Sequence, residues 1–501
     1  MSEISRKRGT SMCAAALLLV LSSNLPAAAG PAQPVEVKLV ASDGEGFDDF
    51  GRAVAIDGDR LAVMATQEDT AGPFTGSIYL FERDPLDVDS WTEVAKLSPA
   101  LDDPEYVLAP ESPLGLSGDT LAIGIDGEVV GRVLVYEIDE LGIPALGEEL
   151  TTGRRRYGAS LAIEGDRLLV GSPGSPEEAI LYHRAPDGSW IEELRLPDPN
   201  SKSDFGKSVA LSSLRFAVAE GPDSDWWEKG TVYIREQAPG GEWIEVAAET
   251  FGDRVYLGWR LAMHKSFLAA SDSLSGAVTI FERGSGGGDQ WERVRDHFGT
   301  IGDPGGSLFG STLDLEGMKL VVGAPNDDLA GNGTGRAFLY HRNQGGAGAW
   351  DERAEIVPSD LEIIDNFGTS VSLSDNTLVV GSPLDDDVGF NSGSVYVYRL
   401  GPMTSVAGSC PGTVTITVRG ATPDGQIAIA WDQGYGRFTI PGGDCPGTVL
   451  DLASPVLVGI FAADGTGSFE ATRDLGAFEC TGWVQAVDVT SCAVTNVTPL
   501  R

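Results

Sequence analysis

The stretch DDFGRAVAIDGDRLAV, residues 48–63, decides the fold, because the chain repeats it. Related phrases begin at residues 203, 307 and 365, where the chain reads SDFGKSVALSSLRFAV, SLFGSTLDLEGMKLVV and DNFGTSVSLSDNTLVV. A repeat of this length indicates that one supersecondary unit is used several times.

The common element of these phrases is an aromatic residue followed by glycine. It occurs as Phe50-Gly51, Tyr157-Gly158, Phe205-Gly206, Phe309-Gly310 and Phe367-Gly368, with Leu257-Gly258 as a weaker copy. A further unit is indicated by GLSGDTLAIG at residue 115, although its pair is lost near Pro110 and Glu111. The seven units are spaced by roughly 50 residues, which is typical of propeller blades.

Each unit divides into four predicted strands. A short alternating strand such as RAVAI leads into a tight turn with glycine, which accepts the positive φ of a two-residue hairpin loop. An apolar second strand ends at GSP or GAP, since proline cannot donate to the ladder. After a polar loop come an aromatic third strand, as in GSIYLFER, and a fourth strand that opens with tryptophan, as in WTEVAKL.

The two ends of the repeat region complement each other. The seventh unit stops after VYVYRL, but the segment VEVKLVASDG at residue 35 resembles WTEVAKLSPA at residue 91. We therefore expect strand 35–40 to complete the last unit and close a ring, which removes exposed sheet edges, whereas an open solenoid would need capping units. The prediction is an all-β protein with a seven-bladed β-propeller over residues 30–401.

Residues 35–400 resemble the FG-GAP repeats of integrin α chains, and most of all the bacterial secreted form with a tryptophan-led outer strand. The resemblance implies that Phe50 and its equivalents pack between blades and that the glycine lets neighbouring backbone approach, so the motif serves packing rather than chemistry. Integrin propellers carry calcium in D-x-D-x-D-G loops between the first and second strands. Here that place holds tight turns such as IDGDRL, so those calcium sites are not carried over.

The regions outside the repeats have different compositions. Residues 1–29 combine a basic start, a short apolar stretch and LPAAAG, which predicts a secretory signal peptide and export to the periplasm, the cell surface or the medium. Residues 402–501 contain alternating apolar runs between glycine-rich turns, which predicts a small accessory β-sandwich, immunoglobulin-like in type. An exported chain with four cysteines in this tail predicts two disulfides among Cys410, Cys445, Cys480 and Cys492. Of the three pairings we favour Cys410–Cys445 and Cys480–Cys492, which close local loops.

Charge limits the class of partner. The 501-residue chain has 74 acidic against 35 basic residues and a formal charge of -39, so phosphate repulsion disfavours nucleic acid. No second apolar run reaches membrane length, and we expect a monomer.

Candidate site residues lie in the loops between second and third strands. Oxygen-rich loops with glycine are compatible with Ca²⁺, which takes six to eight oxygen ligands, although solvated turn residues are the alternative. The acidic clusters are Asp327, Asp328, Asp385, Asp386 and Asp387, with Asp223 and Asp225 in a third loop. The adjacent Trp226 and Trp227 predict an exposed recognition residue, against the alternative of packing between blades.

Enzyme signatures in the sequence are weak. There is no G-x-S-x-G or H-E-x-x-H motif, and the four histidines lie in separate units. We therefore expect a non-catalytic exported binding or adhesion protein that presents a loop face to a protein or glycan. An extracellular polysaccharide lyase or hydrolase, or a purely structural envelope protein, is the alternative. Acids and histidines from several blades converging on the central channel would favour an enzyme.

Overall fold

The computed structural model describes residues 34–84, 87–99, 107–125, 130–199, 204–221, 230–250, 257–272, 276–284, 290–298, 306–328, 331–342, 348–408, 411–422, 424–433, 435–441, 445, 448–465, 467–475, 482–490, 493–495 and 498–500. These residues are strands, turns and loops. The chain divides into two compact units, Pro34–Leu400 and a second unit that begins at Gly401.

The first unit contains seven four-stranded antiparallel sheets, here called blades 1 to 7. Blades 1 to 3 are β2 (Phe50–Asp57) to β5 (Trp91–Leu97) through β3 (Arg60–Ala65) and β4 (Ser77–Arg83); β6 (Leu114–Ser117), β7 (Thr120–Ile125), β8 (Arg132–Ile138) and β9 (Pro144–Leu150); and β10 (Ser160–Glu164), β11 (Arg167–Ser172), β12 (Glu178–Arg184) and β13 (Trp190–Pro197). Blades 4 and 5 are β14 (Val209–Ser212), β15 (Arg215–Glu220), β16 (Thr231–Gln237) and β17 (Trp243–Thr250); and β18 (Leu257–His264), β19 (Phe267–Asp272), β20 (Ala277–Arg283) and β21 (Trp291–Phe298). Blades 6 and 7 are β22 (Thr312–Glu316), β23 (Lys319–Ala324), β24 (Arg336–Arg342) and β25 (Trp350–Ile356); and β26 (Ser370–Ser374), β27 (Thr377–Ser382), β28 (Ser394–Arg399) and β1 (Val35–Leu39).

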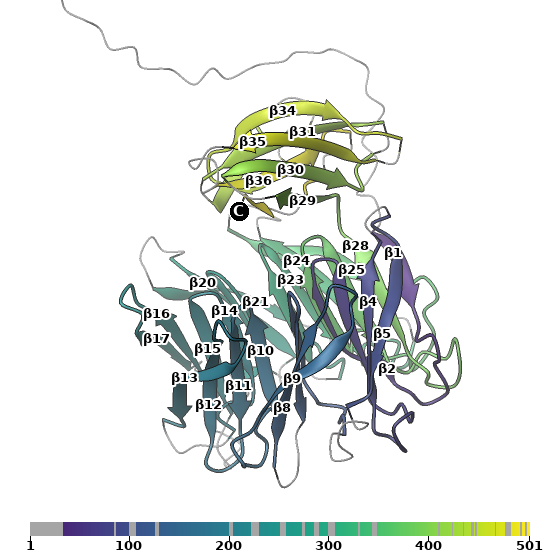
Figure 1. The fold of residues 1–501 in the computed structure, drawn as a ribbon, viewed down its shortest axis with the longest axis vertical. Coiled ribbons are helices and arrows are strands. Elements are labelled where there is room, and N and C mark those ends of the chain that lie inside the picture. Colours follow the sequence, from purple (N-terminus) through teal and green to yellow (C-terminus); the bar gives the residue numbers. More distant parts are fainter. Residues whose placement is uncertain are drawn as a thin grey trace, which may run out of the picture. The chain divides into compact units, whose positions relative to one another are not determined.

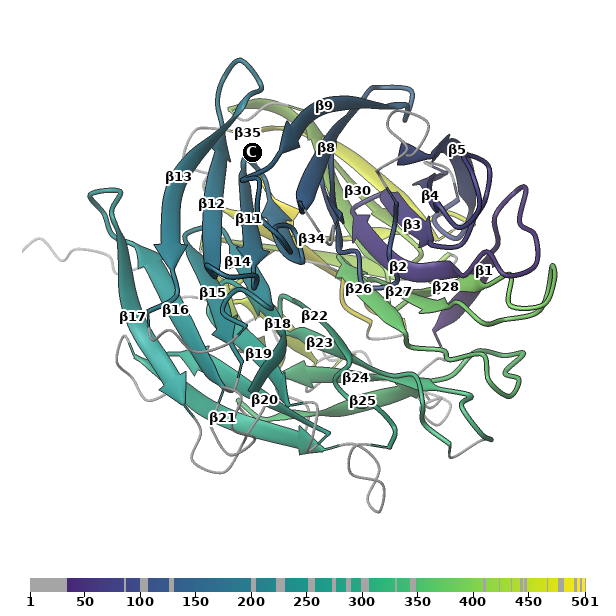
Figure 2. The ribbon, with the colours of Figure 1, turned by 90° about the horizontal axis from the view of Figure 1, so that it is seen from below.

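The blades form a closed ring. The first strand of each blade contacts the first strands of both neighbouring blades, and β26 of blade 7 contacts β2 of blade 1. Figure 1 shows the blades from the side, and Figure 2 shows the first strands near the centre of the ring and the fourth strands on the outside. The unit is thus a β-propeller of seven blades.

The apolar core lies between blades. Seven clusters of buried side chains each combine residues of two adjacent blades, and one of them joins Phe50 and Tyr79 of blade 1 to Val379 and Val395 of blade 7. Each strand alternates sides, so every blade supplies side chains to two clusters. The repetition of the sequence therefore follows from the repetition of these interfaces.

The aromatic–glycine pair has the packing role that the resemblance implies. The aromatic residues Phe50, Tyr157, Phe205, Phe309 and Phe367, and Leu257, are all buried. Gly368 has a φ of +92°, and a Cβ there would lie 2.4 Å from the carbonyl oxygen of Arg336 in the preceding blade. Only glycine avoids both the strained conformation and the clash.

The GAP glycine completes the motif. The Gly368 N–H donates to the carbonyl oxygen of Gly381 in its own blade at 3.0 Å. A Cβ on Gly381 would in turn lie 2.0 Å from the carbonyl oxygen of Gly51 in the next blade. FG and GAP are therefore two halves of one close backbone contact that is repeated around the ring.

The N-terminal strand closes the ring. β1 pairs with β28 in antiparallel register from Val35 opposite Arg399 to Leu39 opposite Val395, which confirms the predicted pairing. It occupies the position of the fourth strand, the one that the seventh repeat lacks in the sequence.

The second unit consists of small sheets. Its strands are β29 (Met403–Gly408), β30 (Gly412–Arg419), β31 (Gln426–Asp432), β32 (Tyr435–Thr439), β33 (Val449–Leu452), β34 (Val456–Ala462), β35 (Phe469–Leu475), β36 (Trp483–Asp488) and β37 (Thr498–Pro499). They pair in the orders β29-β30-β35, β34-β31-β36-β37 and β32-β33. Ile416 and Val418 of the first sheet share an apolar cluster with Ile427 and Ile429 of the second. The immunoglobulin-like type of this unit stays a prediction.

Candidate functional site

One face of the propeller carries most of its long loops. In each blade the first strand begins, the second ends and the third begins at the same edge, because the strands are antiparallel. The loops between second and third strands and the connections between blades therefore share one face, which we call the loop face. The short turns lie on the opposite turn face.

Blades 1, 6 and 7 share one type of loop on this face. Its first acidic residue is Glu68, Asp327 or Asp385, and the carbonyl oxygen of that residue accepts the N–H of the closing glycine, which is Gly76, Gly335 or Gly393. These bonds are 2.9–3.1 Å long. The same backbone is therefore built three times on neighbouring blades.

The first acid of each loop is held by a basic side chain. Arg336 donates to both carboxylate oxygens of Asp327, at 2.8 and 2.7 Å. Lys38 Nζ lies 2.9 Å from Asp385 and 2.8 Å from Asp360, and Lys96 Nζ lies 2.9 Å from Glu68. Although burial lowers it, the pKa of Lys38 ends above its ordinary value because three aspartates surround the ammonium group.

The ion pairs affect both interpretations of the acidic loops. Asp327 and Asp385 are only 2% and 3% exposed, so they are not solvated turn residues. A calcium ion at either position would have to displace Arg336 or Lys38. Among the described residues, no group of three or more His, Cys, Asp or Glu is placed to hold a metal. Calcium binding stays a prediction.

The remaining acids of these loops lie at the surface. Asp328 Oδ1 accepts the N–H of Gly333 at 2.6 Å, and Asp386 Oδ1 accepts the N–H of Asn391 at 2.6 Å. Asp387 forms an ion pair with Lys38. These carboxylates stabilise the loops and leave their negative charge on the loop face.

Apolar side chains are exposed beside these acids. Ile363, Phe74 and Phe390 are 65%, 62% and 61% exposed. The ring centroids of Phe47 and Phe390 lie 5.2 Å apart, and the N–H of Phe47 donates to the carbonyl oxygen of Phe390 at 2.8 Å. We call this set of exposed residues the apolar loop patch: Phe47, Phe74, Ile363, Ile364, Val388 and Phe390.

Several patch residues have a left-handed backbone. Phe47, Phe74 and Ile364 have φ values of +75°, +58° and +74°. Bulky and β-branched residues rarely adopt this region, because the side chain is crowded by the backbone. The connections fix it: Asp48 and Asp365 accept the N–H of Glu45 and Glu362 at 2.7 and 2.8 Å. The conformation turns an apolar side chain toward solvent at a cost in stability.

The channel contains a cavity of about 400 Å³ that is lined by the first strands of all seven blades. Near the turn face it has a ring of polar residues, one from each blade: Asp57, Ser117, Glu164, Ser212, His264, Glu316 and Ser374. Six of them accept an N–H from the turn of the next blade, for example Asp57 from Gly118 at 2.6 Å and Glu316 from Asp375 at 2.9 Å. The ring thus joins the blades to one another.

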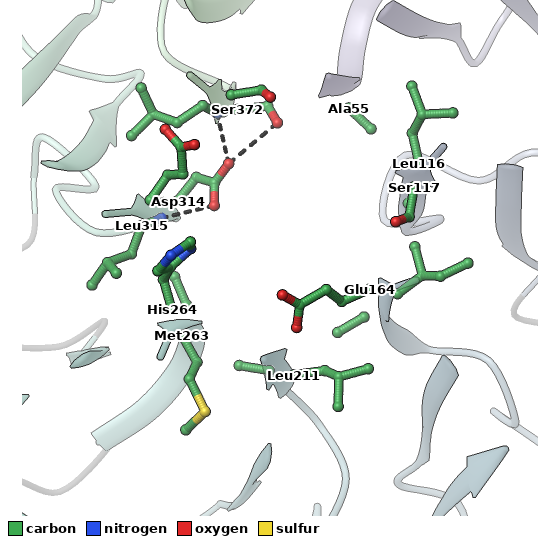
Figure 3. A pocket seen from close by; sticks show the side chains of 18 of the residues that line it. Ala55, Leu116, Ser117, Glu164, Leu211, Met263, His264, Asp314, Leu315 and Ser372 are labelled. Carbon is green, nitrogen blue, oxygen red and sulfur yellow. Dashed lines mark hydrogen bonds between the residues drawn. The ribbon is translucent and has the colours of Figure 1, made fainter. Parts of the chain in front are cut away.

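His264 is the exception in this ring. Figure 3 shows its imidazole, the carboxylate of Glu164 and the carboxylate of Asp314 directed into the same space. Burial and the nearby Lys265 and Lys319 lower the pKa of His264 to about 3, whereas burial raises the pKa of Glu316 to about 7. Acids and a histidine from blades 3, 5 and 6 therefore line the same channel, although the Asp314 carboxylate accepts bonds from Ser372, Leu373 and Leu315.

Some predicted residues lie outside the described part of the chain: the signal peptide, Trp226, Trp227, Asp223 and Asp225, and Cys410, Cys480 and Cys492. Cys445 is buried, with its Sγ 3.3 Å from the carbonyl oxygen of Val489. The disulfide pairing stays a prediction. No helix in the described ranges is long and apolar enough to span a bilayer.

The sequence interpretation missed the apolar loop patch and the cations that hold the acids. The patch had a signal, since Phe74, Ile363 and Phe390 interrupt otherwise polar loops. The sequence also contained a signal for Lys38 and Lys96. Both lysines precede a leucine in VEVKL and WTEVAKL, the two segments whose similarity predicted that the N-terminal strand closes the ring.

Comparisons with known proteins agree with this geometry. The FG-GAP repeat family matches at residues 35–81 and 350–398. No curated protein matches significantly.

Three solved structures illustrate the distant likeness of the fold. A protein from Lactobacillus plantarum has 13% identity and a TM-score of 0.42 over 73% of this chain and 93% of that one. A putative 6-phosphogluconolactonase from Bacteroides fragilis has 11% identity and a TM-score of 0.44, over 82% of this chain and 98% of that one. The periplasmic gluconolactonase of Pseudomonas aeruginosa has 14% identity and a TM-score of 0.41, over 62% of this chain and 87% of that one. Likeness at this level carries no argument about ligands or activity. On the seven sheets, the region Pro34–Leu400 is a β-propeller, and the FG-GAP repeat family matches it at two places.

Proposed function

We propose that the protein is a non-catalytic binding or adhesion protein whose loop face docks a protein partner. The supporting observation is the apolar loop patch on blades 1, 6 and 7. Exposed apolar groups on a monomer mark interaction surfaces when they gather on one face and are held rigidly. Here hydrogen bonds and ion pairs fix the loops that carry them.

The chemistry of the patch selects the partner. Aliphatic Ile363, Ile364 and Val388 favour an apolar protein surface over a sugar. The same loops expose several acidic side chains: Glu45, Asp69, Asp328, Glu362, Asp386 and Asp387. The partner is therefore an apolar protein segment flanked by lysine or arginine, and charge attraction speeds its approach.

The strained conformation supplies a sharp test. Asn tolerates a positive φ far better than Ile does, so Ile364→Asn should stabilise the protein by roughly 1 kcal/mol while it removes a contact residue. Stability gained together with binding lost is the pattern expected of a residue retained for function.

The experiment is a selection of random 12-residue displayed peptides on the immobilised exported chain. We expect peptides rich in both apolar and basic residues, and at least tenfold weaker binding of those peptides to the Ile364→Asn and Phe390→Ser variants. Leu141→Ser and Leu214→Ser are the controls, because both residues are exposed but lie on the turn face. Selected peptides without basic residues, or peptides that bind all variants equally, would refute the proposal, and binding of glycans alone on an array would replace the protein partner with a sugar.

A second candidate function is an extracellular hydrolase or lyase that acts in the central cavity. The observation behind it is that Glu164, His264, Asp314 and Glu316 all line this cavity, where the pKa of His264 is lowered and the pKa of Glu316 is raised. An assay of the protein on extracellular polysaccharides distinguishes this enzyme from the binding protein. The enzyme should degrade a polysaccharide, and the Glu316→Gln variant should not.

A further inference from the structure

The repeat itself reveals a position that has lost its structural task. Two residues after the conserved glycine, four blades have Ser160, Ser208, Thr312 or Ser370. Three of these hydroxyls donate to the carbonyl oxygen of the conserved glycine in the next blade, at 2.7–3.2 Å. Blade 5 has Arg260 at this position, and its Nη1 donates instead to the adjacent carbonyl oxygen of Trp259 at 3.1 Å.

Arg260 belongs to a group of cations. Lys207 Nζ lies 4.0 Å from the ring centroid of Trp259, and Arg260 Cζ lies 5.6 Å from it, so the indole holds two cations. Lys207 and Arg156 share Asp204, at 3.3 and 3.4 Å. On the other side, Arg52 Nε donates to the carbonyl oxygen of Pro110 at 3.2 Å.

These residues lie where the channel opens on the loop face. They stand at or just before the beginning of the first strands, and the residues that follow, such as Val54, Val209 and Leu261, line the central cavity. We call Arg52, Arg156, Lys207, Trp259 and Arg260 the basic mouth.

Two of the four cations of the basic mouth, Arg52 and Arg260, form no ion pair with the described residues, whereas Lys207 and Arg156 both pair with Asp204. Burial lowers the pKa of Arg260, and the attraction of Glu111 does not fully offset this effect. In a chain of formal charge -39, the two guanidinium groups of Arg52 and Arg260 at one opening favour an anion.

We propose that the basic mouth binds the carboxylate group of a small organic acid. The guanidinium fork of Arg260 matches a carboxylate, and Lys207 adds a second charge held by Trp259. The acidic surface around the mouth repels long polyanions and dianionic phosphates more strongly than a single carboxylate. The uncharged part of the acid extends toward the cavity. This site is separate from the apolar loop patch and does not depend on the proposed partner.

The test uses residues that the repeat already accepts. Arg260→Thr installs the residue of blade 6, and Trp259→Ser does the same for the preceding position, where blade 6 has Ser311. Both variants should fold, because these residues occupy the same backbone in another blade. Arg473→Thr removes an exposed charge in the second unit and is the matched control.

Calorimetric titration of the exported chain uses galacturonate, with galactose as the neutral isostere and inorganic phosphate as the other anion. We expect galacturonate to bind more tightly than galactose and phosphate, at least a tenfold loss of affinity in Arg260→Thr and Trp259→Ser, and no change in Arg473→Thr. Equal binding of galactose, tighter binding of phosphate, no binding of galacturonate, or unchanged affinity in Arg260→Thr would each overturn the proposal.

Discussion

The conserved glycines show how one atom can decide an interface. Substituting Gly368 by alanine would combine a φ of +92° with a Cβ 2.4 Å from a carbonyl oxygen, so the blades must separate. Gly165→Ala is the natural control, because Gly165 also has a positive φ, +56°, but no atom within 4 Å of its Cβ position.

We expect Gly368→Ala to lose more than about 3 kcal/mol and Gly165→Ala only about 1 kcal/mol in chemical denaturation. Equal losses would mean that strain, and not the contact between blades, explains the glycine.

Asp365 makes the stability of the propeller depend on pH. Burial and the neighbouring Asp385, Glu362 and Asp386 raise the pKa of its carboxyl from 3.8 to about 6, although the bond from the Glu362 N–H opposes the shift. The folded state then binds more protons than the unfolded state between these values, so this contribution to stability falls as pH rises through them.

Asp365→Asn keeps the acceptor oxygen and removes the titration. It should therefore add up to about 3 kcal/mol at pH 7.5 and little at pH 4. The contrasting variant is Asp360→Asn: although burial raises it, the pKa of Asp360 is lowered by Lys38 and Tyr396, so this variant should cost stability at pH 7.5. Melting curves of both variants at the two pH values check the signs, and a gain from Asp360→Asn would contradict the ion-pair assignment.

The blade is the unit that the sequence predicts best. Strand positions, tight turns and the vacant fourth place follow from local patterns, namely alternation, glycine, proline and tryptophan. The partners of the loop acids could not be predicted in the same way, because Lys38 and Asp385 are 347 residues apart and meet only after the ring closes. The exposure of Phe74 and Phe390 depends likewise on loop conformation, which alternation does not encode.

Two equivalent ion-pair clusters allow the closing strand to be tested within one protein. Lys38 on β1 contacts Asp385, Asp360 and the ring of Tyr396, and Lys96 on β5 contacts Glu68, Asp43 and the ring of Tyr79. Either Lys→Met change leaves buried carboxylates unpaired and should cost about 2 kcal/mol locally.

Lys38→Met should lower the melting temperature more than Lys96→Met, since it also loosens the chain end that closes the ring. A smaller effect of Lys38→Met would show that β1 contributes little to closure.

The whole chain should behave as two folding units, because the compact region Pro34–Leu400 is distinct from the tail. Calorimetry of residues 30–501 should show two transitions, and residues 34–400 alone should keep the propeller transition within about 2 °C. A reductant should lower only the tail transition if the predicted disulfides form, since all cysteines after residue 29 lie in the tail. One merged transition that disappears on truncation would contradict this division.

The account depends most on the pairing of β1 with β28, and cysteine cross-linking measures it directly. Val37 lies opposite Val397, and Val379 lies opposite Val397 on the other side, one strand further away. Neighbouring strands allow a disulfide, whereas a pair separated by an intervening strand is too far apart. We predict that Val37→Cys with Val397→Cys, folded under oxidising conditions, gives a linked peptide by mass spectrometry and that Val37→Cys with Val379→Cys does not. No link in the first pair, or a link in the second, would contradict the closed ring.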